Sequence, residues 1–262
     1  MNIINPYRFA GAGDPVANPL HYWDLTNLTA TVGGGLYDQG TGNWGALTSS
    51  HYPVRLVGGN GPAGLSSCLD FTPSTTNSDH LTMSTSKAWD GGTNDISISM
   101  WVYHDDFGAA SYESLFTWRD GAGAGNRLTW MRVQTDTTYD HLEFRIYDEN
   151  DNNDVAEDDS ATGDLTAGQW YHYVSVWNST TGVMDLYVNN SLYATTTTSG
   201  IGDLDTTAHQ FVIGSGIGGS LGLASTSLDG RMFALGIYNY PLTTSDISHL
   251  YNGGAGRIYA DL

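Results

Sequence analysis

The feature that most constrains the fold is a succession of short strand-like runs separated by turn residues. Residues 96–102 alternate between apolar and small polar side chains, which is the period of a half-buried strand. Residues 142–147 alternate in the same way, with Leu142, Phe144 and Ile146 on one face and Glu143, Arg145 and Tyr147 on the other. The chain also contains 33 glycines. Many short strands with frequent turns are typical of an antiparallel β-sandwich.

Further runs extend this pattern to the end of the chain. Residues 171–177 and 183–188 flank one turn, and residues 192–195 follow a second, which predicts a three-stranded meander. Two later strands are expected at 209–213 and 231–238. One short C-terminal helix is expected, because Thr243 to Asp246 resembles a capping box and Asn252, Gly253 and Gly254 stop the apolar spacing that follows it.

Length and composition favour a single β-domain. The chain has 262 residues, of which 40% are hydrophobic, and this is enough for one large core. We expect an irregular N-terminal arm at residues 1–18, the β-domain at 19–257 and a tail at 258–262. The acidic stretch at residues 148–164 is expected to be a solvated loop.

The charge of the chain limits the classes of partner that it can bind. The formal net charge is −19, which disfavours nucleic acid and anionic membrane surfaces. The acidity is explained either by solvation in salty surroundings or by cation sites. Cys68 is the one cysteine, so no intrachain disulfide can form, and its strand-like context predicts a buried thiol. No apolar run is long enough to span a membrane, and the N-terminus has no signal-peptide pattern, so we expect synthesis in the cytoplasm.

An ordered set of stretches resembles the laminin G-like jelly roll of the concanavalin A-like family. The matching segments lie at residues 22–25, 38–43, 69–71, 79–81, 96–102, 168–174, 186–190, 230–232, 237–242 and 247–251. The resemblance implies an all-β fold, a two-sheet antiparallel jelly-roll sandwich, with Phe71, Trp101 and Trp170 in its core. Where the family carries an acidic pair associated with calcium, this chain has Phe233 and Ala234. We therefore expect no cofactor, and Asp70 and Asp79 are the only weak candidates for a metal site.

The arm carries a second resemblance, to the start of virion proteins of tailed phages that contain this jelly roll. The residues concerned are Asn5-Pro6-Tyr7-Arg8-Phe9-Ala10. The resemblance implies a virion structural protein, either a capsid-decorating or a tail-associated subunit, located in the virion and oligomeric in the assembly. The arm residues expected to dock onto other virion subunits are Ile3, Ile4, Tyr7, Arg8 and Phe9. The alternatives are a free-standing, extracellular carbohydrate-binding or adhesin module and, third, a glycoside hydrolase.

The acidic residues weaken the hydrolase alternative. Glycosidases place two carboxylates about 5–10 Å apart across the sugar bond. The chain has four glutamates, and Glu143 and Glu149 on one strand would lie roughly 20 Å apart. We predict no catalytic residue, although distant strands could still bring two acids together. The spacing of Asp148, Asn150, Asn152 and Asp154 resembles a calcium loop, but position six is Asn153 rather than glycine, which favours a solvated turn.

Outward-facing side chains on two neighbouring strands are the candidate ligand-binding residues. They are Trp130, Arg132, Arg145 and Tyr147. Arginine is scarce in this chain, so two arginines on adjacent strands form a cationic spot in an acidic surface, which would suit a surface glycan. The alternative is that both arginines serve in intramolecular salt bridges.

Overall fold

The structure is a computed structural model of the whole chain. It describes residues 19, 21–23, 35–37, 44–46, 53–57, 59–64, 67–74, 78–83, 95–107, 112–119, 128–135, 140–148, 152–158, 165–198, 200–202, 204, 210–215 and 227–257. The predicted arm at residues 1–18 and the predicted tail at 258–262 lie outside these residues. The docking residues Ile3, Ile4, Tyr7, Arg8 and Phe9 therefore stay a prediction.

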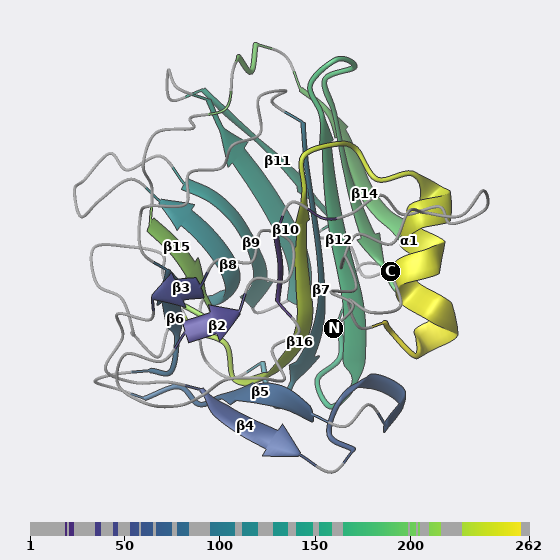
Figure 1. Cartoon of the computed structure of the whole chain (residues 1–262). Helices are drawn as coiled ribbons and strands as arrows, with labels where there is room; N and C mark the ends of the chain where they lie inside the picture. The colour runs from purple at the N-terminus through teal and green to yellow at the C-terminus, as the bar shows by residue number, and fades with distance from the viewer. Residues whose placement is uncertain are drawn as a thin grey trace, which may run out of the picture.

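Two antiparallel sheets stack face to face (Figure 1). The larger sheet has eight strands in the order β14-β13-β12-β7-β16-β5-β4, and β1 also pairs with β16. Its strands are β1 (His21–Trp23), β4 (Val54–Val57), β5 (Ser67–Phe71), β7 (Ile96–His104), β12 (Trp170–Asn178), β13 (Val183–Val188), β14 (Ser191–Thr197) and β16 (Gly230–Tyr238).

The smaller sheet has six strands in the order β11-β10-β9-β8-β15-β6. Its strands are β6 (Leu81–Met83), β8 (Tyr112–Arg119), β9 (Leu128–Thr135), β10 (Asp140–Tyr147), β11 (Asn153–Glu157) and β15 (Gln210–Ile213). A separate pair, β2 (Gly35–Tyr37) and β3 (Trp44–Ala46), completes the strands of the described part of the chain. The expected all-β jelly-roll sandwich is confirmed.

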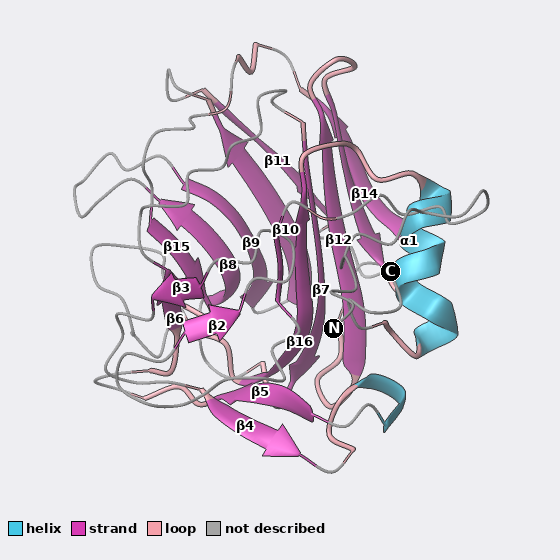
Figure 2. Cartoon of the chain, viewed as in Figure 1, coloured by secondary structure: helices cyan, strands magenta, loops and turns pink. Residues whose placement is uncertain are grey.

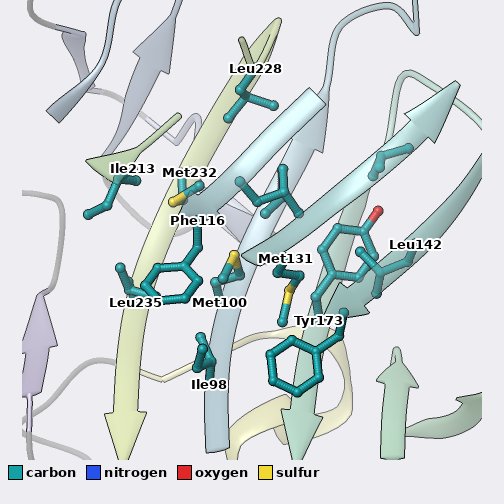
Figure 3. Close-up of a cluster of buried hydrophobic side chains, with 14 of the residues drawn as sticks. Ile98, Met100, Phe116, Met131, Leu142, Tyr173, Ile213, Leu228, Met232 and Leu235 are labelled. Atoms are coloured by element: carbon teal, nitrogen blue, oxygen red, sulfur yellow. The ribbon is translucent and has the colours of Figure 1, made fainter. Parts of the chain in front are cut away.

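The main core fills the space between the two sheets. Figure 3 shows side chains of both sheets meeting there, among them Met100 and Tyr173 of the larger sheet and Phe116 and Leu142 of the smaller one. These side chains are fully buried. The predicted inward set on β10, namely Leu142, Phe144 and Ile146, belongs to this core. The alternation along β10 was therefore assigned to the correct face.

The predicted C-terminal helix is α1 (Thr244–Tyr251), and it covers the outer face of the larger sheet (Figure 2). Thr243 and Asp246 form the expected capping box, and Asn252 ends the helix in the left-handed conformation. Ile247 and Leu250 pack against outer-face residues of β12 and β16, namely Val174, Val176 and Tyr238. Two short 3-10 segments, η1 (Pro62–Gly64) and η3 (Asn252–Gly254), are also present. No helix in the described part of the chain is long and apolar enough to cross a membrane.

Two expectations need correction. The acidic stretch at 148–164 is not simply a solvated loop, because β11 lies within it and pairs with β10, and Asp148 has no exposed surface. Cross-strand packing overrides the polar composition there. Trp101 and Phe71 are core residues as expected, at 3% and 1% exposure, but Trp170 is only partly buried, because it begins β12 at the rim of the sheet.

Candidate functional site

Four side chains predicted to bind a ligand come from β9 and β10, which are neighbours in the smaller sheet. Arg132 lies directly opposite Glu143, and Trp130 directly opposite Arg145. Direct cross-strand partners share one face of a sheet. Because Met131 and Phe144 face the core, Arg132 and Arg145 lie on the outer face, as the alternation predicted. The register places the backbone of Trp130 beside that of Arg145, and Tyr147 lies two residues further along the same face of β10.

Glu143 is the centre of this arrangement and binds both arginines. Its Oε2 accepts from Nε of Arg132 at 2.8 Å and lies 2.7 Å from Nη2. Its Oε1 accepts from Nε of Arg145 at 3.2 Å. We call Arg132, Glu143 and Arg145 the Glu143 cluster. The intramolecular salt bridge considered for these arginines therefore exists, and it carries one net positive charge.

Other polar groups hold the two guanidinium groups in place. Nη2 of Arg132 donates to Gln134 at 3.3 Å, and its guanidinium lies 3.8 Å from the centre of the Tyr112 ring. Nη1 of Arg145 donates to Oδ1 of Asn153 on β11 at 3.0 Å. The cluster is thus a fixed arrangement of charges on a sheet rather than a pair of independent surface arginines.

The outer face becomes more accessible from β8 toward β11. Thr117 on β8 and Glu143 on β10 are buried, at 0% and 1% exposure, and the side chain of Arg132 is 10% exposed. The side chains of Arg145 and Glu157 reach 27% and 37%. Arg145 and Glu157 are therefore more accessible to a ligand than Arg132, Glu143 and Thr117, and they lie on the β10–β11 side of this face.

Sequence reasoning missed one member of this edge. Glu157 lies directly opposite Glu143 on β11, and its Oε2 is 3.6 Å from Nε2 of His141. Two glutamates therefore lie directly opposite each other on neighbouring strands, which the pattern of a single strand cannot show. Glu143, however, already accepts from an arginine with each of its oxygens.

The two weak metal candidates are engaged with protein groups. Oδ1 of Asp70 lies 3.5 Å from Nε of Arg231, and Oδ2 of Asp79 accepts from the backbone of Thr72 at 3.1 Å. Burial raises the pKa of Asp70, and the charge of Arg231 opposes the rise. At the positions of the family's acidic pair, Phe233 and Ala234 pack in an apolar cluster. The described residues contain no group of three or more potential metal ligands.

In the part of residues 148–154 that the structure describes, Asp148 binds protein groups and has a structural role rather than beginning a calcium loop. Its Oδ1 accepts from the backbone of Asn152 at 2.8 Å. Its Oδ2 accepts from the side chain of Asn152 and from the backbone of Gly202, at 2.8 and 2.9 Å. These bonds tie the end of β10 to a distant loop, and residues 149–151 are outside the described chain.

A second buried polar group lies inside the sandwich, where a ligand has no access. Nδ1 of His104 is 2.6 Å from Oε2 of Glu113, and Nε2 is 2.9 Å from the Tyr173 hydroxyl. All three side chains are essentially unexposed. Burial raises the pKa of Glu113, and the hydrogen bond from His104 opposes it. We interpret the group as a satisfied core network.

Comparison with known proteins agrees with this fold. The model of the concanavalin A-like lectin/glucanases superfamily (laminin G type 3) matches residues 75–248, well over half of the chain. The chain belongs to this family. No curated protein sequence matches it.

Several solved structures have a fold similar to that of this concanavalin A-like chain. The botulinum neurotoxin serotype D binding domain is 15% identical, with a TM-score of 0.56 over 90% of this chain and 51% of that one. The binding domain of botulinum neurotoxin DC, solved in complex with SialylT, is 12% identical, with a TM-score of 0.61 over the same shares. A heptameric SAP-like pentraxin from Limulus polyphemus is 22% identical, with a TM-score of 0.45 over 60% of this chain and 70% of that one. The chain spans about half the length of the neurotoxin domains, and the likeness shows a lectin-like jelly-roll fold.

Proposed function

We propose that this chain is a virion structural protein, a capsid-decorating or tail-associated subunit, whose jelly roll is an interaction or glycan-binding module. The observation that carries the binding part is the Glu143 cluster. It holds the Arg145 guanidinium, partly exposed, at an accessible edge of the outer sheet face. A fixed guanidinium suits a hydroxyl-rich ligand, because it offers several donors without having to be ordered on binding.

The residues around Arg145 complete the proposed site. Tyr147 is partly buried, and Asn153 lies directly opposite it on β11. Both belong to the same face as Arg145 and supply a phenol and an amide. A sugar hydroxyl donates and accepts hydrogen bonds, and this set provides both kinds of partner. The neurotoxin DC binding domain with this fold has been solved with SialylT, which supports a saccharide as the ligand class.

The carboxylate pair favours glycoside hydrolysis as a second candidate. Glu143 and Glu157 are direct cross-strand partners, so their Cβ atoms lie about 5 Å apart. Hydrolysis needs one carboxyl group that gives up a proton to the leaving oxygen. Glu143 is instead bound to two guanidinium groups, one at each oxygen, which suits a structural anion rather than a proton donor. We therefore propose binding without catalysis.

The glycan-binding part is tested with an array of bacterial polysaccharides and sialylated oligosaccharides. Arg145→Ala should lose signal on the glycans that the wild-type chain binds. Arg55→Ala is the matched control, because Arg55 is exposed on β4 of the other sheet and its removal changes the net charge equally. Equal loss in both variants, or no loss in Arg145→Ala, contradicts the proposed site.

The virion part rests on the resemblance of the N-terminal arm and is tested separately. Left exposed, Ile3, Ile4, Tyr7 and Phe9 would be an apolar liability, and buried aromatics often dominate subunit interfaces. Deletion of residues 2–12 should abolish incorporation into particles while leaving the melting temperature nearly unchanged. Normal incorporation of the truncated chain rules out the arm as the docking element. Unfolding of the truncated chain would favour the free-standing binding module.

A further inference from the structure

Four residues from four neighbouring strands form a straight row on the outer face of the larger sheet. Trp170 on β12 lies opposite Tyr103 on β7, Tyr103 lies opposite Arg231 on β16, and Arg231 lies opposite Asp70 on β5. We call these four residues the outer row. Adjacent strands are about 4.8 Å apart, so the row extends over roughly 14 Å. All four side chains are partly exposed.

Direct contacts join each member of the outer row to the next. The rings of Trp170 and Tyr103 meet edge to face, with centroids 5.7 Å apart. The Arg231 guanidinium lies over the Tyr103 ring, 4.6 Å from its centre. Its Nε is 3.5 Å from Asp70, and its Nη2 donates to Oδ1 of Asp105 at 3.1 Å. The row is therefore an ordered surface of two rings and an ion-paired guanidinium.

The next row along the same strands shows where this surface ends. Trp101 and His172 lie opposite each other two residues further along β7 and β12. Tyr251 at the end of α1 stacks on both rings, at centroid distances of 5.7 and 6.0 Å. The helix thus buries the rings of Trp101 and His172, with Trp101 at 3% exposure, and the outer row beside them stays partly exposed.

The geometry points to a second saccharide site at the outer row, which takes a neutral oligosaccharide. The side chains of Arg231, Asp70 and Asp105 are 26%, 27% and 38% exposed. Each carboxylate engages Arg231 through Oδ1, which leaves Oδ2 able to accept from sugar hydroxyls. Trp170, which is partly exposed, offers its ring to the C–H face of a sugar, and Tyr103 supports that ring edge to face.

Charge selects a neutral ligand for this site. One guanidinium lies between two carboxylates, so an acidic sugar would meet repulsion from Asp70 and Asp105. The excess of acids over bases in the whole chain acts in the same direction. The length of the row favours an oligosaccharide over a single sugar. This site is separate from Arg145, which lies on the outer face of the opposite sheet.

NMR spectra of both the ligand and the protein test the inference with four neutral hexasaccharides: maltohexaose, cellohexaose, laminarihexaose and mannohexaose. At least one should bind the wild-type chain and shift the Trp170 indole N–H resonance, which Trp170→Phe identifies. Trp170→Ala should abolish this binding. Asp105→Asn, a mild change at an exposed carboxylate, should weaken it roughly tenfold. Asp105→Asn keeps the test valid if Trp170→Ala does not fold.

Two controls separate this site from the one at Arg145. Leu192→Ala changes an exposed residue, 55% accessible, at the far edge of the same sheet and should bind as the wild type does. Arg145→Ala should also keep the hexasaccharide. Binding lost in Arg145→Ala but kept in Trp170→Ala would overturn the outer row while supporting the proposed function. If none of the four sugars binds, or the Trp170 resonance does not move, the inference is wrong.

Discussion

Arg132 and Glu143 form an ion pair across β9 and β10, with only 10% and 1% of their side chains exposed. A buried pair is costly to break, because the remaining charge has lost its compensation. Glu143→Gln leaves two guanidinium groups without their shared anion. We expect it to lower the free energy of unfolding by about 3 kcal/mol, measured by urea denaturation. Glu157→Gln, on the same face but more exposed, should cost less than about 1 kcal/mol. A cost for Glu143→Gln no greater than that of Glu157→Gln would contradict the cluster.

Gly230 begins β16 next to Arg231, and its backbone fits closely against β7. A Cβ atom there would lie 1.9 Å from the carbonyl oxygen of Tyr103. Gly230→Ala must therefore displace β7 or β16, and we expect a loss of at least about 3 kcal/mol in the free energy of unfolding. Gly168→Ala is the control, because Gly168 also has a positive φ but has no atom within 4 Å of the added carbon. Similar melting temperatures for the two variants would show that the strands adjust easily.

His172 makes the stability of the fold depend on pH. Burial lowers its pKa to about 3, against about 6.5 for an exposed histidine. The unfolded chain therefore binds the proton more tightly, and stability falls as the pH drops from about 6.5 toward 3. Between pH 7 and pH 5 this group should cost about 2 kcal/mol.

The variant His172→Phe isolates that contribution. It keeps a ring against Trp101 and Tyr251 but cannot take up a proton. Subtracting its pH profile from that of the wild type also cancels the opposite effect of Glu113, whose raised pKa favours folding at low pH. Parallel profiles for the two proteins would show that His172 is not the group responsible.

Chelation of calcium should change the melting temperature little. Asp70 is paired with Arg231, and Phe233 and Ala234 occupy an apolar cluster. We expect a shift of less than about 2 °C on adding EDTA. A tightly bound structural ion contributes several kcal/mol, so a loss of more than about 10 °C would reveal a site elsewhere in the chain.

The sequence predicted the strands and the face on which each side chain lies better than it predicted which residues pair across neighbouring strands. Alternation alone placed Arg145 on the outer face of β10, and the scarcity of arginine drew attention to Arg132 beside it. The cross-strand pairing of Glu143 with Glu157 was missed because β11 reads as part of an acidic loop, and strand pairing there depends on contacts with β10.

The outer row was harder still to predict. Asp70, Tyr103, Trp170 and Arg231 come from four separate segments, and only the register of three strand pairs aligns them. Register depends on long-range packing that no local pattern encodes. The resemblance to the family implied that Trp170 is in the core, and nothing in the local sequence shows that α1 covers Trp101 but leaves Trp170 partly exposed.

The distinction between binding and hydrolysis is the central claim, and one assay addresses it directly. The chain is incubated with laminarin, agarose, carrageenan and alginate, and newly formed reducing ends are measured. Because Glu143 is bound by two arginines, we predict no release above the level of buffer alone. Reproducible release that disappears in Glu157→Gln would contradict this account and identify the carboxylate pair as catalytic.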